Sequence, residues 1–410
     1  MSVFNRLKPV MLAAAMLATA AGPTIAQGKA PPAARPSGNW ATSWGTALAQ
    51  AGAGLDNNTI RQVLRLSKGG ERFRIRISNV LGTQPLRIGA VTIARPLLTE
   101  RGQALVGAVD AATNVPVTFN GQAQIEIAPG MSAASDPVAF PNSSLSDVTV
   151  SLFVASGPVA RHAYSLATAW TAAGNQTAEA RLSNAKEVTS WLAISAVEVE
   201  TANPRTIVAI GDSTTDGVGS TPNANRRWPD YLAERLAEAG RPYAVVNTGI
   251  GANLLLGRGG VVERFDRDAL SFEGVHSVIV LAGINDFGFP GVTRQPQNLP
   301  TADKIIAGLR DLIARAHAKG VRIIGGTIMP YAGTKLPGYY SQEGEVQRRL
   351  VNDWIRKGRA FDGVIDFEAA VRDPKDPSRF AADLHAGDFL HPNDAGYRRM
   401  ADAVDLRLFR

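Results

Sequence analysis

Cysteine is absent from this sequence of 410 residues. Its absence excludes disulfide bonds, thiolate zinc sites and cysteine nucleophiles. Stability must therefore come from the burial of apolar side chains. At roughly 150 residues per domain, a chain of this length holds two or three cores, and we favour two.

Long apolar runs are also missing, because none reaches the roughly 18 to 20 residues that a membrane-spanning helix needs. The longest lies at residues 10–21, after two basic residues and before small residues around Ala26. This order is typical of an export signal, so we expect cleavage of residues 1–26 and a soluble mature protein in the periplasm or outside the cell. Residues 27–39, rich in Ala and Pro, are expected to form a flexible leader.

Clustered charge is the third absence. The formal net charge is +7, and removal of the expected signal lowers it by two, to +5. Lys and Arg are scattered and meet only in doublets such as Arg226-Arg227. We expect no nucleic-acid partner, because such sites gather basic residues on one face. Weak attraction to acidic cell-surface polymers is compatible with this bias.

Two hydrophobic patterns divide the chain. Over residues 40–200, apolar and polar positions alternate in segments such as Arg72–Ser78 and Asp147–Val154. Strands without intervening helices predict an antiparallel β-sandwich or jelly roll. Over residues 204–410, buried strands alternate with helices, which predicts an α/β domain with a parallel sheet covered on both faces. The boundary is expected at residues 201–204.

In the second half, three polar residues follow expected strands. The expected strands are residues 206–210, 243–247, 275–282, 321–327 and 363–367, and the expected helices are residues 229–239, 301–319 and 345–359. Parallel sheets of this kind bind ligands beyond the carboxyl ends of their strands. Ser213, Asn253 and Asn285 each follow an expected strand, so we expect them to share one rim.

Two common motifs are incomplete. A dinucleotide-binding turn is not indicated, because Leu254 occupies the third glycine position after Gly249 and Gly251. The Gly-x-Ser-x-Gly elbow of α/β-hydrolases is missing as well, since Thr215 stands at its final glycine.

Four other blocks occur in a definite order. They are Gly211-Asp-Ser213 after the first strand, Gly249-Ile-Gly-Ala-Asn253, Gly283-Ile-Asn-Asp286, and Asp388-Phe-Leu-His391-Pro392 near the C-terminus. With these blocks, residues 205–408 resemble the SGNH hydrolases, also called GDSL-type esterases and lipases. The resemblance implies a flavodoxin-like three-layer domain. It also implies a nucleophile at Ser213, a base at His391, an orienting acid at Asp388, and oxyanion donors at Ser213, Ala252 and Asn285.

Elementary chemistry supports the same roles. A serine hydroxyl is a poor nucleophile at neutral pH, and a histidine titrates in the right range to take and return its proton. Asp388, three residues before His391, can reach the far ring nitrogen and hold the required tautomer. Main-chain N–H groups at Ser213 and residue 252, with the Asn285 amide, can face the oxygen that becomes negative.

Two positions depart from the family pattern. Thr214 stands where the family has leucine, which concerns packing rather than chemistry. Ala252 stands where the family usually has glycine. A positive φ at Ala252 would cost roughly 1 to 2 kcal/mol. Gly251 is therefore an alternative source of the loop donor.

The same residues also have interpretations without catalysis. Taken alone, Ser213 is typical of a helix cap and Asn285 of a turn. His385, Asp388 and His391 form an alternative set of metal ligands, but that interpretation leaves Ser213 and Asn285 unexplained. We expect no metal and no organic cofactor.

Other polar residues have simpler expected roles. Asp212 and Asp216 are expected to brace the serine turn. His162, His276 and His317 have no motif nearby, so we expect them to be structural or solvated.

The sequence thus predicts an exported serine esterase that hydrolyses carboxylic esters through an acyl-enzyme. We favour short acyl groups, such as acetyl, on carbohydrate, with a small-molecule or polysaccharide ester as partner. The alternatives are a lipase or arylesterase, an acyltransferase with the same residues, and a carbohydrate-binding surface protein whose hydrolase-like half is passive. Structural support is the favoured role of the β-rich half, because no cluster of aromatics stands out there. The oligomeric state stays open.

Overall fold

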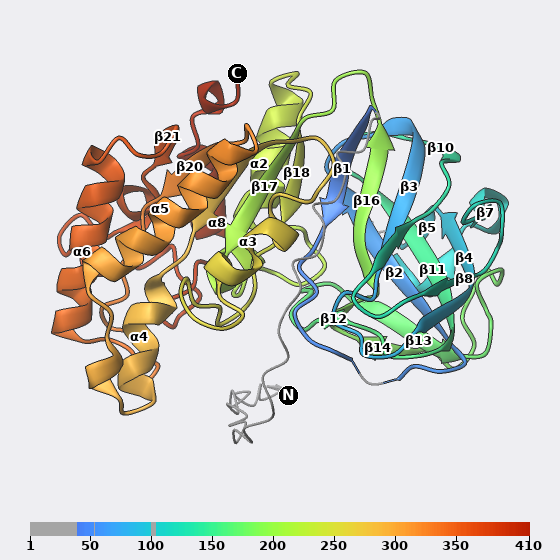
Figure 1. Ribbon diagram of the computed structural model, residues 1–410, viewed down its shortest axis with the longest axis horizontal. Helices are drawn as coiled ribbons and strands as arrows, with labels where there is room; N and C mark the ends of the chain where they lie inside the picture. The colour runs from blue at the N-terminus through green and yellow to red at the C-terminus, as the bar shows by residue number, and fades with distance from the viewer. Residues whose placement is uncertain (1–38, 53, 100–103) are drawn as a thin grey trace, which may run out of the picture. The chain divides into compact units, whose positions relative to one another are not determined.

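The computed structural model describes residues 39–410, apart from residues 53 and 100–103 (Figure 1). The expected export signal of residues 1–26, and all but the last residue of the expected leader, lie outside the described residues. No helix within the described ranges has the length and apolar character needed to cross a bilayer.

Antiparallel strands build the first half of the described chain. One sheet has the order β1 (Trp40–Gly45), β16 (Ile194–Glu200), β3 (Gly70–Ser78), β10 (Val138–Asn142), with β9 (Ser132–Ala134) paired to β3. The other has the order β14 (Lys186–Val188), β13 (Ala169–Ala173), β2 (Asn58–Leu66), β11 (Ser146–Ser156), β4 (Leu86–Ala94), β7 (Val115–Val117), with β8 (Ile125–Ile127) paired to β4. Two ribbons join β5 (Pro96–Leu98) to β6 (Ala104–Val109) and β12 (Arg161–His162) to β15 (Trp191–Leu192).

The two larger sheets share one apolar core. Successive side chains of a strand point to opposite faces, so every second residue can be buried on the same side. Ile75 and Ile77 of β3 and Val150 and Leu152 of β11 follow this rule and are fully buried in one cluster. The expected sandwich-like arrangement of residues 40–200 is therefore observed.

A five-stranded parallel sheet follows. Its order is β18 (Ala244–Asn247), β17 (Thr206–Gly211), β19 (Val275–Leu281), β20 (Arg322–Gly326), β21 (Gly363–Ile365). In chain order this is 2-1-3-4-5, the flavodoxin-like order. The direction of winding reverses between β17 and β19, and ligands of such sheets bind beyond the strand ends at this point.

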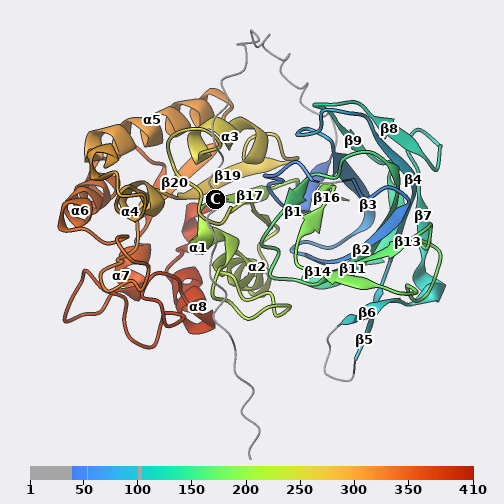
Figure 2. The same ribbon diagram turned by 90° about the horizontal axis from the view of Figure 1, so that it is seen from below.

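Helices cover both faces of the parallel sheet (Figures 1 and 2). They are α1 (Ser213–Asp216), α2 (Trp228–Glu238), α3 (Val261–Asp268), α4 (Ile284–Val292), α5 (Ala302–Ala318), α6 (Gln342–Lys357), α7 (Phe367–Val371) and α8 (Asp394–Asp402). Val208 and Ile210 of β17 pack with α3, α5 and α6, whereas Ile207 and Ala209 pack with α2, α7 and α8. The alternation within one buried strand thus builds a three-layer domain.

Buried polar contacts join the two halves. The N–H of Thr42 in β1 donates to Thr206 Oγ1 in β17 at 3.0 Å, and Thr42 Oγ1 accepts from the N–H of Glu273 at 2.9 Å. The Glu273 carboxylate in turn pairs with Arg74 of β3 at 2.7 Å. By contact, the described residues form one compact unit. The expected domain boundary at residues 201–204 stays a prediction.

The predicted elements of the second half are confirmed, and several shorter helices were not predicted. The strands at residues 206–210 and 275–282 and the helix at residues 301–319 are observed with ends shifted by a few residues. Among them are α3, which is short, and α4, which contains Pro290. Both lie next to the candidate site.

Candidate active site

Ser213 lies at the first turn after β17, at the switch point of the sheet. It is the first residue of α1, and its side chain is mostly buried. The preceding Asp212 accepts the N–H of Thr214 at 3.0 Å and caps the helix. A Cβ at Gly211 would lie 2.2 Å from Leu281 O, so only glycine allows this close turn. The turn presents the serine hydroxyl at the carboxyl end of the strand.

His391 meets this hydroxyl from a distant part of the chain. Its Nε2 lies 2.9 Å from Ser213 Oγ, although 178 residues separate the two in sequence. Its Nδ1 lies 2.6 Å from Asp388 Oδ2. Because the carboxylate accepts from Nδ1–H, Nε2 is left with a lone pair for the serine proton. Ser213, His391 and Asp388 therefore form one chain of hydrogen bonds.

Asp388 is held as a carboxylate. Its Oδ1 accepts the N–H groups of Leu390 at 3.0 Å and of His391 at 2.9 Å. Burial opposes ionisation, but the hydrogen bond and charge of the His391 ring, with the two N–H groups, lower the pKa of Asp388 to about 2. The residue therefore accepts from the imidazole across the whole neutral range.

The loop after β18 packs directly on the serine turn. Ile250 N–H donates to Gly211 O at 3.1 Å. The N–H of Gly251 donates to Asp216 Oδ2 at 2.8 Å, so this group is already committed. No acceptor is recorded for the N–H of Ala252 or of Ser213 among the described residues. Of the two candidate loop donors, Ala252 is the one whose N–H is unengaged.

Ala252 adopts the strained conformation. Its φ is +61°, in the left-handed region that favours glycine. The methyl group costs roughly 1 to 2 kcal/mol there. Alanine has a backbone N–H as glycine does. The loop keeps at residue 252 the conformation that glycine favours, so the N–H stays in place at the cost of this strain.

Asn285 lies in the first turn of a neighbouring helix, just after β19. It is the second residue of α4 and is nearly fully buried. Its Nδ2 donates to Asn253 O at 2.9 Å, and its Oδ1 accepts from Tyr339 Oη at 2.6 Å. Since Asn253 O can only accept, the amide nitrogen must face the loop. One Nδ2–H remains for a ligand oxygen.

Tyr339 was not given a role from the sequence. It is fully buried, and its ring lies so close to α4 that a Cβ at Gly288 would be 2.3 Å from it. A glycine within the helix was the only local signal for this contact. Its partner, Asn285, lies 54 residues away in sequence.

Arg264 of α3 is a second residue that sequence reasoning missed. Its guanidinium donates to Gly211 O at 2.9 Å, to Thr248 O at 2.8 Å and to Asn253 Oδ1 at 2.9 Å. It also pairs with Asp268 at 3.3 Å. One buried cation thus ties the serine turn to both ends of the loop that contains Ala252.

Two further carboxyl groups lie buried around the site. Asp286 accepts the N–H groups of Leu255 at 2.7 Å and Leu256 at 3.0 Å, which anchors the chain after the loop. Burial raises the pKa of Asp286 to about 6, and burial likewise raises that of Asp212 to about 6. Their low polarity surroundings disfavour the charged form.

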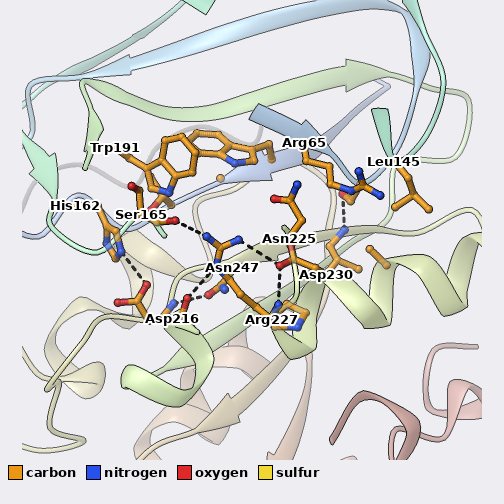
Figure 3. Close-up of a pocket in the computed structure, with 18 residues that line it drawn as sticks. Arg65, Leu145, His162, Ser165, Trp191, Asp216, Asn225, Arg227, Asp230 and Asn247 are labelled. Atoms are coloured by element: carbon orange, nitrogen blue, oxygen red, sulfur yellow. Dashed lines mark hydrogen bonds and ion pairs between the residues drawn. The ribbon is translucent and has the colours of Figure 1, made fainter. Parts of the chain in front are cut away.

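Asp216 does more than brace the turn. Its Oδ1 lies 2.9 Å from Nε2 of His162, which comes from β12 in the β-rich half (Figure 3). Burial opposes charge on the imidazole, but the Asp216 carboxylate and two carbonyl contacts raise the pKa of His162 above its usual value. His162, expected to be structural or solvated, is buried, and its partner Asp216 lies three residues after Ser213 in the sequence.

The histidines of the alternative metal set are engaged otherwise. Both ring nitrogens of His391 face Ser213 and Asp388, and Nδ1 of His385 accepts the N–H of Gly387 at 2.9 Å. No group of three His, Asp or Glu residues within the described ranges could hold a metal ion.

Comparison with known proteins identifies one family. Residues 209–399 match the model of the GDSL-like Lipase/Acylhydrolase family. No curated protein is significantly similar to the chain.

Several solved structures are similar to about half of the chain. One is a mutant of an acetyl-xylooligosaccharide esterase from Geobacillus Stearmophilus, with 22% identity over 48% of this chain and 91% of that chain and a TM-score of 0.37. A carbohydrate acetylesterase from Sinorhizobium meliloti has 15% identity over 48% and 95%, with a TM-score of 0.38. A GDSL-like lipase from Bacteroides thetaiotaomicron has 16% identity over 51% and 91%, with a TM-score of 0.38. At these identities and TM-scores, the likenesses carry no argument about function.

Proposed function

We propose that this protein hydrolyses carboxylic esters through an acyl-enzyme on Ser213. Residues 209–399 match the model of the GDSL-like Lipase/Acylhydrolase family, which supports a carboxylic ester hydrolase. The observation that carries the proposal is the 2.9 Å contact between Ser213 Oγ and His391 Nε2. A hydroxyl at this distance from an imidazole lone pair can lose its proton as it attacks.

In the first step, Ser213 Oγ attacks the ester carbonyl while His391 Nε2 takes the hydroxyl proton. The charge that develops on the imidazole is stabilised by the Asp388 carboxylate, 2.6 Å from Nδ1. The protonated His391 then donates to the departing alcohol oxygen. The C–O bond breaks, and the acyl group stays on the serine.

The carbonyl oxygen becomes negative in this step. We assign its stabilisation to the N–H groups of Ser213 and Ala252 and to the free Nδ2–H of Asn285. Donors that are fixed before the reaction need no rearrangement as charge develops, and each typically contributes about 3 to 4 kcal/mol. The network around Asn285 and Arg264 supplies this fixed arrangement.

In the second step, water takes the place of the alcohol. His391 removes a proton from the water, the oxygen attacks the acyl carbon, and the serine hydroxyl is regenerated with release of the acid. If an alcohol entered instead, the same residues would transfer the acyl group. Product analysis with an added alcohol acceptor distinguishes hydrolysis from transfer.

Hydrolysis of p-nitrophenyl acetate by the Ser213→Ala variant tests the mechanism. The expected result is a loss of kcat of up to about a million-fold, the size seen for nucleophile loss in serine enzymes, with an unchanged thermal unfolding curve. Ser271→Ala is the matched control, since Ser271 is an exposed serine that donates to Arg267 O. Turnover by Ser213→Ala at the rate of the Ser271→Ala variant would overturn the mechanism.

For the substrate we propose short acyl groups, such as acetyl, on carbohydrate, and we propose export to the periplasm or outside the cell. The support is the N-terminal sequence pattern and the addition of a β-rich half to the hydrolase domain, an analogy at the level of architecture. A series of p-nitrophenyl esters from acetate to palmitate tests the acyl preference. An optimum at long chains would favour the lipase alternative, and binding of polysaccharide without ester turnover would favour the binding-protein alternative.

A further inference from the structure

A short segment of the β-rich half, residues 162–165, lies against the serine turn and the loop that contains Ala252. The segment comes from β12 and the residues that follow it, and two of its residues, His162 and Ser165, line a cavity together with Trp191 and Arg227 (Figure 3). Three separate contacts connect it to the hydrolase domain. Through Asp216 and Gly251, these contacts connect the segment to Ala252, whose N–H is a proposed oxyanion donor.

The first contact is a buried ion pair. His162 Nε2 lies 2.9 Å from Asp216 Oδ1 and 3.1 Å from Tyr164 O, and Nδ1 lies 3.0 Å from Ala47 O. Backbone carbonyls can only accept, and each ring nitrogen faces one, so both ring nitrogens must carry protons. His162 is therefore an imidazolium, and only 3% of it is exposed.

Asp216 contacts both His162 and the loop that contains Ala252. Its Oδ1 meets the imidazolium, while its Oδ2 accepts the N–H of Gly251 at 2.8 Å. Gly251 precedes Ala252, whose N–H is a proposed oxyanion donor. The hydrogen bond from the Gly251 N–H holds the peptide between Ile250 and Gly251, and the next peptide along the chain carries the Ala252 N–H. The carboxylate therefore stands between the β-rich half and the oxyanion loop.

Two further contacts hold the same assembly. The guanidinium of Arg227 donates to Asp216 O at 3.1 Å through Nε and to Ser165 O through a second nitrogen. The ring of Tyr164 covers Gly251, since a Cβ there would lie 3.3 Å from it. Both ends of the 162–165 segment thus touch residues that shape the loop.

We propose that His162, supplied by the β-rich half, is a positioning residue that sets the oxyanion loop through Asp216. The proposal rests on the proposed function, because it requires the N–H of Ala252 to stabilise the oxyanion. It makes the β-rich half part of the catalytic apparatus and more than a support. The serine, histidine and aspartate of the hydrogen-bonded chain do not depend on it.

The consequence is selective for the chemical step. Without the imidazolium, Asp216 has no buried cation on Oδ1, and the carboxylate that accepts the Gly251 N–H is less firmly held in place. Transition-state stabilisation should fall while ground-state binding, which does not need the oxyanion donors, changes little. A structural role alone would lower stability and leave kcat for the folded enzyme unchanged.

The test compares four variants of the full chain: His162→Ala, His162→Gln, Asp216→Asn and the double variant His162→Ala/Asp216→Asn. With p-nitrophenyl acetate we expect His162→Ala and Asp216→Asn each to lower kcat by about 10- to 100-fold, a fraction of the loss of a whole oxyanion donor, with KM changed less than about threefold. His162→Gln, whose side-chain amide can donate to Asp216, should recover most of the lost kcat. The double variant should be no slower than Asp216→Asn, because both changes break one connection.

The control is His317→Ala. His317 also pairs with an aspartate, Asp362, at 2.9 Å, but on an exposed surface away from the site. We expect its kcat to equal that of the unmodified enzyme. Thermal unfolding of each variant separates loss of folded protein from loss of rate. If His162→Ala does not fold, kcat of Asp216→Asn decides.

Reaction with a fluorophosphonate separates failure of this proposal from failure of the proposed function. If Ser213 of the unmodified enzyme is not labelled, the proposed function fails. If it is labelled, and His162→Ala and Asp216→Asn are labelled and turn over ester at the unmodified rate, only the positioning role fails. Additive losses in the double variant would also overturn it.

Discussion

Removal of one hydroxyl, in Tyr339→Phe, tests whether the orientation of Asn285 matters for catalysis. Tyr339 Oη donates to Asn285 Oδ1 at 2.6 Å, and both side chains are buried. Without the hydroxyl, the buried Oδ1 is left without a donor. The amide then keeps only its bond to Asn253 O at 2.9 Å.

The magnitude follows from these contacts. An unsatisfied buried acceptor costs about 1 to 3 kcal/mol of folding stability, which lowers the Tm by several degrees for a domain of this size. Complete removal of an oxyanion donor typically costs 10²- to 10³-fold in kcat. Since Tyr339→Phe loosens the Asn285 amide without deleting it, we expect a loss of about tenfold, and about 10²- to 10³-fold for Asn285→Ala.

The assay is kcat and KM for p-nitrophenyl acetate, together with thermal unfolding. Tyr243→Phe is the matched control, because the Tyr243 hydroxyl also donates to a buried carbonyl, Phe409 O, but at the other end of β18. We expect it to lower the Tm and leave kcat unchanged. Tyr339→Phe in the Asn285→Ala background should lower kcat no further. A Tyr339→Phe enzyme with a lowered Tm and a normal kcat would refute the reasoning.

Three other predictions concern the same site. Asp388→Asn should lower kcat by about 10⁴-fold, as in a serine protease with the same change, because the amide favours the wrong tautomer of His391; ester turnover measures it, and a loss below tenfold would count against the assigned role. Ala252→Gly should keep kcat and raise stability by up to about 1 kcal/mol, because it relieves the positive φ but adds chain entropy; a lowered Tm would contradict the strain. Burial raises the pKa of Asp212 to about 6, above the roughly 3.9 of an unfolded aspartate. Between these values the folded state binds more protons than the unfolded state, so the free energy of unfolding falls as pH rises from about 4 to about 6. Asp212→Asn, which keeps an oxygen for the N–H of Thr214, should remove this loss in unfolding curves from pH 4 to pH 8, and equal pH dependence in both proteins would show that the carboxyl does not titrate there.

Local patterns were sufficient to predict most of the parallel-sheet domain. The run before Gly211 is wholly apolar because β17 is buried on both faces, and this is the strongest signal a strand can have in sequence. The expected rim at Ser213 and Asn285 followed from the same rule, since both residues come directly after strands that lie side by side in the sheet. The helices α3 and α4 were missed because one is short and the other contains residues that usually end helices.

Long-range pairings were outside the reach of local patterns. Tyr339 and Asn285 are brought together by packing of separate elements, and neither residue marks the other in sequence. His162 has no motif around it, and its partner Asp216 belongs to the other half of the chain. The positive φ of Ala252 is set by the loop around it, although the residue type alone would disfavour that conformation. Tertiary contacts decide such features.

Peptide mapping after reaction with a fluorophosphonate tests the central claim most directly, because the reagent reacts with a serine only where a base and oxyanion donors activate it. We expect a single adduct, on Ser213, in the unmodified protein, and strongly slowed labelling in His391→Ala. An adduct on another serine, or unlabelled Ser213 in a protein that still hydrolyses esters, would contradict the assignment.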